Sequence, residues 1–233
     1  MPTVVVTGAS QGIGRAVAEA FAKEPDARLA LVSRSREKLE AVAAQCRAQG
    51  ADAAVFACDV TDDAAVQQTA RAVLERWGAP DVLVNNAGLF RPGTVRETTP
   101  VLFREQVAVN LTSAFVVTQA FLDAMTARGR GHLFYMASVA SIRGYPGGAA
   151  YCAAKHGLLG LARVVREETK PMGLRVTTLL PGATLTPSWD GVDLPEERFM
   201  PPEDIARTVL DIYRLSDRTV VEEILLRPQL GDV

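Results

Sequence analysis

Tyr151 and Lys155 are the two side chains whose types and spacing point most directly to chemistry. They are four residues apart in a segment that reads as a helix, so the phenol and the ammonium share one helix face. A free tyrosine titrates near pH ~10 and is a poor acid–base catalyst at neutral pH, but a cation within ~4–6 Å favours the phenolate. Lys155 could therefore bring the pKa of Tyr151 closer to the operating pH. This spacing alone is a weak signal, because such pairs are frequent on helix surfaces.

A glycine-rich turn near the beginning of the chain is typical of a nucleotide site. Val4 to Val6 predict a buried strand, the spacing Gly-x-x-x-Gly-x-Gly follows it, and a helix with Val17 and Phe21 on one face comes next. A strand, a glycine turn and a helix in this order aim backbone N–H groups at a pyrophosphate. The spacing is a variant of the usual dinucleotide fingerprint, and a plain glycine-rich turn is the alternative. The turn residues expected to bind the cofactor are Gly8, Ser10, Gln11, Gly12, Ile13 and Gly14.

The residues after the next two predicted strands indicate which dinucleotide binds. A site that prefers NAD places an acidic residue about 20 residues beyond the glycine turn, on the ribose 2′-hydroxyl, but this chain has Ser33 and Arg34 there. Because a guanidinium can bind a 2′-phosphate through two charge-assisted hydrogen bonds, the sequence predicts NADP(H), with Arg34 as the main determinant. A solvated surface arginine is the alternative interpretation of Arg34. Asp59 and Val60 are expected near the adenine, although Asp59 is nearly as good a candidate for a helix cap.

Alternating strands and helices must position these residues. Strands are expected at residues 4–6, 29–32, 53–57, 81–85, 132–136, 176–180 and 220–226, and helices at 15–21, 37–49, 61–77, 99–126, 149–170 and 202–214. Thr61 and Thr99 are the expected caps of two of the helices. Short apolar strands separated by helices predict one α/β domain over residues 1–233, a Rossmann-like, doubly wound parallel sheet of about seven strands with helices on both faces. Polar and glycine-rich residues directly follow the strands, so one rim of the sheet is expected to carry the chemistry.

Composition and charge argue against several other classes of protein. Of the 233 residues, 48% are hydrophobic and 22% are charged, and the net charge of −2 gives no reason to expect a nucleic acid or an anionic membrane as a partner. No apolar run is expected to span a bilayer, and the immediate start of the first strand leaves no room for a signal peptide. Cys46, Cys58 and Cys152 lack metal-type spacing. We therefore expect no metal and a reducing, cytoplasmic compartment.

Several motifs, taken as a set, resemble those of the short-chain dehydrogenase/reductase family. In order along the chain they are Gly8-x-x-x-Gly12-x-Gly14, Asn85-Asn86-Ala87-Gly88, Asn110, Ser138, Tyr151-x-x-x-Lys155 and Pro181-Gly182. The resemblance is dense over residues 3 to 186 and looser beyond them. It implies an NADP-binding oxidoreductase that acts on a small carbonyl substrate.

The resemblance also implies a role for each of these positions. Tyr151 would protonate the carbonyl oxygen during reduction, and Ser138 would hydrogen-bond that oxygen. Lys155 would lower the pKa of Tyr151 and hold the nicotinamide ribose, and Asn110 would anchor a water in the proton relay. The remaining cofactor contacts would be Asn86, Ala87 and Gly88 on the adenine-ribose side and Pro181, Gly182, Thr184 and Thr186 near the nicotinamide. Such a site fits chemistry in which the cofactor carries the hydride and the protein stabilises a developing alkoxide.

The substrate is less sharply predicted than the cofactor. Residues 187–202 contain four prolines and Trp189 without clear periodicity, and the resemblance implies that they form a lid. Leu89-Phe90 and residues 142–148 would form the other walls. The tail and Trp189 are similar to a bacterial sepiapterin reductase branch of the family, which would imply reduction of a ketone on a pterin side chain or a comparable diketone. The alternatives are a 3-oxoacyl-thioester reductase and a sensor that binds NADP without catalysis. Family members are often dimers or tetramers, so we expect self-association.

Overall fold

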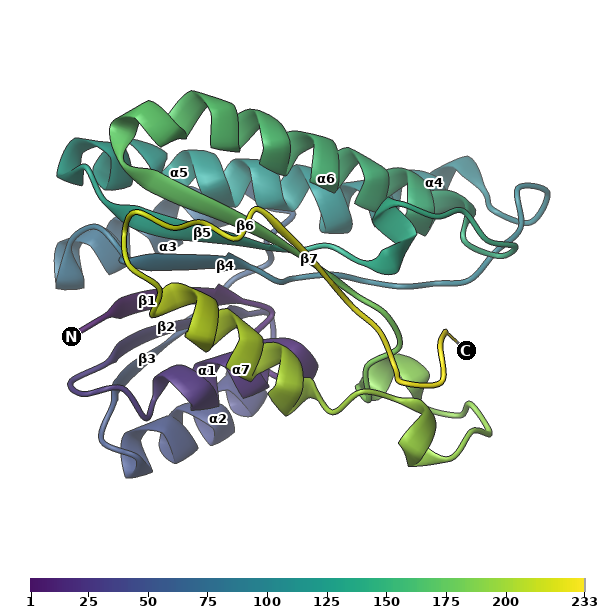
Figure 1. Ribbon diagram of the computed structural model, residues 1–233, viewed down its shortest axis with the longest axis horizontal. Helices are drawn as coiled ribbons and strands as arrows, with labels where there is room; N and C mark the ends of the chain where they lie inside the picture. The colour runs from purple at the N-terminus through teal and green to yellow at the C-terminus, as the bar shows by residue number, and fades with distance from the viewer. Residues whose placement is uncertain (233) are drawn as a thin grey trace.

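A seven-stranded parallel sheet runs through the middle of the molecule, in the order β3-β2-β1-β4-β5-β6-β7 (Figure 1). The structure is a computed structural model, and it describes residues 1–232. The strands are β1 (Thr3–Thr7), β2 (Arg28–Ser33), β3 (Asp52–Ala57), β4 (Val82–Asn85), β5 (Gly131–Met136), β6 (Leu174–Pro181) and β7 (Glu223–Leu226). The predicted doubly wound parallel sheet is confirmed.

Helices cover both faces of this sheet. They are α1 (Gly12–Phe21), α2 (Arg36–Ala48), α3 (Asp63–Trp77), α4 (Pro100–Val107), α5 (Ser113–Arg128), α6 (Ala149–Thr169) and α7 (Pro202–Tyr213). The helices α1, α2 and α7 pack on one face, and α3, α5 and α6 pack on the other (Figure 1). Every loop that connects a strand to the following helix therefore emerges at the same rim of the sheet.

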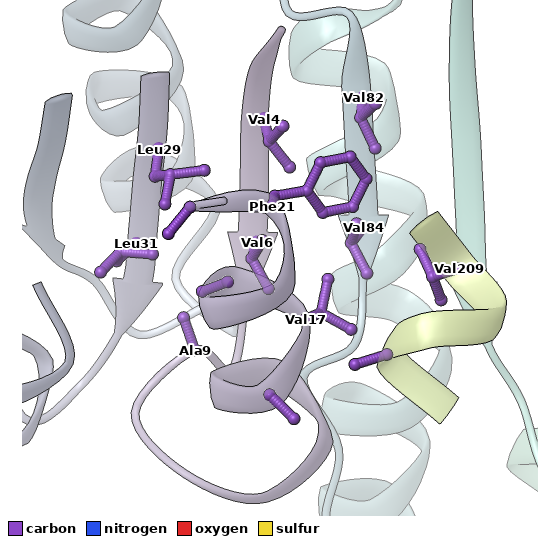
Figure 2. Packing of buried hydrophobic residues seen from close by; sticks show 14 of the residues in the cluster. Val4, Val6, Ala9, Val17, Phe21, Leu29, Leu31, Val82, Val84 and Val209 are labelled. Carbon is purple, nitrogen blue, oxygen red and sulfur yellow. The ribbon is translucent and has the colours of Figure 1, made fainter. Parts of the chain in front are cut away.

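The core beneath α1 shows how alternation along β1 builds both layers. Val4 and Val6 point toward α1, where Val17 and Phe21 pack on them (Figure 2), while Val5 joins the core on the opposite face. Residues two apart on a strand share a face, so the run of three valines serves both layers. Full burial of such a side chain contributes about 1.5–3 kcal/mol. This packing holds the turn after β1 against the sheet.

The reversal of strand order next to β1 sets the position of the site. From β1 the chain builds outward through β2 to β3, and it then returns to β4 on the other side of β1. In open α/β sheets, ligands bind outside the carboxyl ends of the strands at such a switch point. The glycine turn after β1 and the Asn-Asn-Ala-Gly segment after β4 lie on the two sides of it.

Most element boundaries lie within one to three residues of the sequence-based expectations, and three details differ in a way that has a physical reason or affects the site. Asp62, and not Thr61, caps α3, because the Asp62 carboxylate accepts a hydrogen bond from the Ala65 amide. The helix expected at 99–126 contains a π-helical segment, Ala108–Thr112, between α4 and α5. The last strand begins at Glu223 and not at Val220.

The helical run Pro100–Arg128 corrects the expectation about membrane spans. By length and composition alone it is apolar enough to cross a bilayer, with 39% of its apolar window buried. Part of that apolar surface is explained by packing, since α5 contributes Val117, Phe121 and Met125 to the core. Phe103 and Phe115 remain exposed on the outer side.

Candidate active site

One large cavity, of about 1260 Å³, lies at the carboxyl rim of the sheet. Every residue predicted for the catalytic or cofactor site lines this cavity except Gly14. A Cβ on Gly14 would lie 2.4 Å from both the Gly8 carbonyl oxygen and Asn86 Nδ2. Gly14 is therefore needed for close packing of α1 against the β1 and β4 turns, and its contact with the cofactor stays a prediction.

The glycine turn is held open for a ligand by its neighbours. Gly8 and Gly12 have φ values of +66° and +55°, which glycine adopts without strain. Asn86 Nδ2 donates to the Thr7 carbonyl at 2.9 Å, and the Thr7 hydroxyl accepts from the Asn86 and Ala87 amides. Gln11, at the N-cap of α1, makes no side-chain capping bond. The N-terminal amides of α1 thus have no capping side chain, which suits a pyrophosphate.

A basic corner of the cavity fits a 2′-phosphate. Ser33 Oγ is buried without a hydrogen-bond partner, and Arg34 lines the cavity and makes no ion pair among the described residues. Lys38 also lines it, and its ammonium donates to Gln11 Oε1 at 3.4 Å. Sequence reasoning missed Lys38, although its place in the first turn of α2, four residues after Arg34, was a usable signal. An unpartnered donor beside two cations fits the extra phosphate of NADP.

Asp59 holds the turn after β3. Its Oδ1 accepts from the Thr61 amide at 2.9 Å and from the Thr61 hydroxyl at 2.7 Å, and these hydrogen bonds lower the pKa of the carboxyl. Asp59 and Val60 both line the cavity. The carboxylate therefore shapes the turn itself, and its contact with an adenine stays a prediction.

Tyr151, Lys155 and Ser138 come together where α6 begins beside the end of β5. The ammonium of Lys155 lies 5.6 Å from the centroid of the Tyr151 ring and donates to the Met136 carbonyl at 2.7 Å. Burial lowers the pKa of Lys155 to about 8. Burial raises the pKa of Tyr151 to about 12, and hydrogen bonding to Ser138 opposes that rise. The net direction for Tyr151 is thus opposite to the expected lowering, because desolvation of the phenolate outweighs the other effects.

Two side-chain amides hold the segment that follows β4. Asn110 Nδ2 donates to the Leu89 carbonyl at 2.8 Å, and Asn110 Oδ1 accepts from the Leu89 amide at 3.1 Å. Gln106 makes the same pair of bonds to the backbone of Arg91, at 3.0 and 3.2 Å. We call these two pairs of hydrogen bonds the amide clamps. Phe90 lies between them, and its ring packs edge-on against Tyr151 with the ring centroids 5.0 Å apart. The side chain of Asn110 is thus bound to protein, and sequence reasoning missed Gln106.

Aromatic and charged side chains form the far end of the cavity. Phe90, Tyr145 and Trp189 line it, and Trp189 packs on Phe199 with ring centroids 5.0 Å apart. The segment expected to be a lid contains two short 3₁₀ helices, Pro187–Trp189 and Glu196–Arg198. Arg143, Arg227 and Asp232 also line this end, and sequence reasoning did not find the last two. No local sequence pattern predicts the contacts that Asp232, near the end of the chain, makes with these arginines.

Comparisons with known proteins agree with this geometry. The family model for short chain dehydrogenase matches residues 2–196. The sepiapterin reductase of Chlorobaculum tepidum is 39% identical over 237 residues, covering 99% of this chain and 97% of that protein. An alcohol dehydrogenase from the archaeon Thermococcus sibiricus, complexed with 5-hydroxy-NADP, is 33% identical with a TM-score of 0.93 and covers 100% of this chain and 99% of that one.

A polyketide ketoreductase has the same fold. An actinorhodin polyketide ketoreductase variant with NADPH is 29% identical with a TM-score of 0.90, covering 100% of this chain and 98% of that one. The cavity, the basic corner and these relatives agree on an NADP-dependent oxidoreductase that acts on carbonyl or alcohol groups. The chain belongs to the short-chain dehydrogenase family.

Proposed function

We propose that the protein uses NADPH to reduce a ketone of a small substrate to an alcohol. The observation that carries this proposal is the meeting of Ser138, Tyr151 and Lys155 in one cavity with the glycine turn and the basic corner. A hydroxyl donor, a proton donor and a cation beside a nucleotide cradle are the groups that a carbonyl reduction needs.

Each catalytic residue has a distinct task in this proposal. NADPH, when bound, supplies the hydride that adds to the carbonyl carbon. Tyr151 gives its proton to the carbonyl oxygen, and a phenol whose pKa is about 12 is fully protonated at neutral pH and ready to do so. Ser138 donates a hydrogen bond to the same oxygen and so stabilises the developing alkoxide. Lys155 holds its ammonium 5.6 Å from the centroid of the Tyr151 ring, from where it would stabilise the phenolate charge and bind the nicotinamide ribose.

Asn110 acts through the backbone in this proposal. Both polar atoms of its amide are bonded to protein, to Leu89 and Gln106. A π-helical turn leaves its carbonyl groups out of the regular i to i+4 pattern. The water that returns a proton to Tyr151 would therefore bind at a backbone carbonyl in the turn that contains Asn110.

The cofactor contacts follow the lining of the cavity. The glycine turn and the uncapped start of α1 would hold the pyrophosphate, and Ser33 and Arg34 would hold the 2′-phosphate. Asp59 and Val60 would border the adenine. Asn86 to Gly88 would border its ribose, and the segment 181–186 would border the nicotinamide.

The substrate we propose is a small ketone or diketone next to a flat or apolar group, such as the side-chain ketone of a pterin. Phe90, Tyr145 and Trp189 supply aromatic walls for such a group. The similarity over almost the full chain to a sepiapterin reductase supports the same class.

Reduction of 3-oxoacyl thioesters is the second candidate. Its support is the likeness to a polyketide ketoreductase, whereas the aromatic walls favour the smaller ketone. A sensor that binds NADP without catalysis is disfavoured, because binding alone does not need the group of Ser138, Tyr151 and Lys155.

Replacement of Tyr151 by Phe tests the mechanism. We expect Tyr151→Phe to lower kcat for NADPH-dependent diketone reduction by about 10²–10⁴-fold, the usual contribution of a general acid, while NADPH still binds with a similar Kd. The assay is NADPH oxidation over diketones, pterins and 3-oxoacyl thioesters, together with a fluorescence titration of NADPH. Unchanged turnover of every accepted ketone in the variant would overturn the assignment of Tyr151.

We also propose that the protein self-associates in the cytoplasm through the outer sides of α4, α5 and α6. Phe103, Phe115 and Val164 are exposed large apolar side chains on these helices, and a second copy of the chain would cover them. The three cysteines are free and buried, which suits a reducing compartment. Sedimentation analysis tests the assembly, since a strictly monomeric protein at micromolar concentration would contradict it.

A further inference from the structure

Arg143 and Arg227 meet at the substrate end of the cavity, although they come from distant parts of the chain. Arg143 lies in the loop before α6, five residues after Ser138, and Arg227 directly follows β7. Both line the cavity that contains Ser138 and Tyr151. We call them the arginine pair.

One carboxylate already bridges the arginine pair. Asp232 Oδ2 accepts from Arg143 Nη1 at 3.1 Å and from Arg227 Nη2 at 2.7 Å, while Asp232 Oδ1 accepts from Arg227 Nε at 3.0 Å. The fork on Arg227 has the bidentate geometry in which guanidinium binds carboxylate best. A carbon placed as Cβ on Gly182, in the turn after β6, would lie 3.2 Å from Asp232 Oδ1, so this carboxylate sits against the cavity wall itself.

The arrangement holds more positive than negative charge and more donors than acceptors. Arg198 of the proposed lid donates to the Asp232 backbone carbonyl at 3.4 Å, so two guanidiniums contact the Asp232 carboxylate and a third contacts its backbone (Figure 1 shows the end of the chain beside the lid). Each guanidinium carries five N–H groups. Within residues 1–232 the arginine pair bonds to no side chain other than Asp232, so most of its N–H groups have no protein acceptor.

We propose that the arginine pair is a recognition site for the carboxylate of the substrate, and that Asp232 occupies this site until the substrate arrives. This inference rests on the proposed function and selects, among the small ketones and diketones proposed there, those that carry a carboxylate, in place of the uncharged ketone of a pterin. An incoming carboxylate replaces one carboxylate by another, so the arginines exchange partners without being left unpaired. The segment from Pro228 to Asp232 lies beyond the last strand and beyond Arg227, so its displacement breaks no strand pairing and leaves the arginine pair in place.

The reaction itself is unchanged by this recognition. The hydride adds to the ketone carbon, the proton goes from Tyr151 to the ketone oxygen, and the substrate carboxylate forms only hydrogen bonds and ion pairs. The two ends of the cavity therefore have different functions: Tyr151 transfers the proton at one end, and the arginine pair binds the substrate carboxylate at the other.

The test compares oxo acids with their uncharged esters. NADPH oxidation is measured with 2-oxopentanoate and 4-oxopentanoate and with the methyl ester of each, and the readout is the ratio of kcat/KM for acid over ester. For the acid that the wild-type protein prefers, we expect Arg143→Gln and Arg227→Gln each to lower this ratio about tenfold or more, the loss expected for a charge-assisted hydrogen bond. Arg207→Gln, an exposed charge on α7 outside the cavity lining, is the matched control and should leave the ratio unchanged.

Asp232→Asn is expected to change the acid-over-ester ratio in the opposite direction, and it distinguishes a competing Asp232 from a purely structural one. If Asp232 competes with the substrate, removal of its charge raises the acid-over-ester ratio, whereas a purely structural Asp232 would lower turnover of acid and ester alike. A ratio that falls in Asp232→Asn, or that the arginine variants leave at the wild-type value, overturns the proposal.

Binding without turnover separates this inference from the proposed function. Pentanoate and pentan-1-ol are titrated into the NADP⁺-loaded protein, with the fluorescence of Trp189 in the cavity wall as the signal. We expect pentanoate to bind more tightly than pentan-1-ol, and more tightly still in Asp232→Asn. If no ketone is reduced but pentanoate binds in this way, the proposed reaction is wrong and the carboxylate site is supported. If acid and alcohol bind equally, the carboxylate site is wrong and the proposed reaction is unaffected.

Discussion

Arg34 and Lys38 line the same corner of the cavity, and their chemistry differs. Arg34 presents a planar fork that can hold a phosphate through two parallel bonds, while Lys38 is a strongly hydrated point charge that also bonds to Gln11. We therefore expect Arg34→Ala to raise the KM for NADPH by about 10–100-fold, corresponding to ~1.5–3 kcal/mol for hydrogen bonds to a charged group. Lys38→Ala should raise it less, and neither should change the KM for NADH by more than a few-fold.

Steady-state kinetics with both dinucleotides check this prediction. Arg36→Ala is the matched control, because Arg36 is an exposed arginine at the start of α2 that does not line the cavity. Equal losses for NADPH and NADH in Arg34→Ala would show that the guanidinium does not read the 2′-phosphate.

At the scale of elements, the two amide clamps connect the helical run Pro100–Arg128 to the substrate wall. Asn110 and Gln106 are four residues apart and bond the backbone on either side of Phe90. The side chain of Gln106 bonds only to the backbone of Arg91, which is not one of the predicted cofactor residues. It is a positioning residue that acts through Phe90, whose ring lies against Tyr151.

Gln106→Leu tests this role. The substitution leaves the partly buried Arg91 amide and carbonyl without their partner, which costs at most about 1–3 kcal/mol of stability. We expect the KM for the ketone to rise more than the KM for NADPH, because Phe90 borders the substrate and not the nucleotide phosphates. Gln68→Leu, on the exposed side of α3, controls for the loss of an amide. Parallel changes in both KM values would contradict a positioning role.

The π-helical segment shows why an element could be predicted while its detail could not. The pattern Thr99-Pro100 and the apolar residues beyond it predict one long helix, and the helix is there. A π-helical turn changes only the backbone hydrogen-bond partner, from i+4 to i+5, and leaves no mark in the spacing of apolar residues. The same holds for the cap of α3, since Thr61 and Asp62 are both good capping residues and only Asp62 reaches the Ala65 amide.

At the scale of the whole molecule, a buried histidine links stability to pH. His132 is 1% exposed, and its Nε2 donates to Thr177 Oγ1, because that hydroxyl itself donates to the Val221 carbonyl. His132 Nδ1 is buried without a partner, and burial together with Arg175 lowers the pKa of His132 well below its usual value. The imidazole is thus neutral in the folded protein.

The sign of the pH effect follows from proton uptake. Below pH ~6.5 the unfolded chain binds a proton at His132 that the folded protein does not, so the unfolded state gains stability as the pH falls. We expect the free energy of unfolding to be fully developed above pH ~6.5 and to fall by at most about 1.4 kcal/mol per pH unit below it from this residue. Urea unfolding at pH 5.5 and 7.5 measures it, and His132→Gln should reduce the difference. An equal difference in the variant would assign the acid sensitivity to other groups.

Local sequence motifs predicted the order of the elements and the main site residues, whereas the features that sequence did not predict depend on long-range contacts. The order of strands and helices, the glycine turn and the group around Tyr151 follow from residues close together in sequence, and the structure brings those at strand ends into one cavity. The contacts of Asp232 with Arg143 and Arg198 depend on where the end of the chain returns, which no local pattern encodes. The net rise in the Tyr151 pKa depends on burial, which is a property of the folded cavity.

The central place of β1 has a consequence for how the chain folds as it is synthesised. β1 is made before the other six strands of this sheet, and one of its two hydrogen-bonding edges faces β4, whose residues are 82–85. At a synthesis rate of about 5–20 residues per second, that edge stays unpaired for roughly 4–16 s. Val4, Val5 and Val6, all fully buried in the finished protein, are the side chains at risk of wrong contacts in that interval. Among the strands with two neighbours, β1 thus has the longest interval between its own synthesis and that of its second neighbour. During that interval its unpaired edge makes the growing chain prone to aggregation.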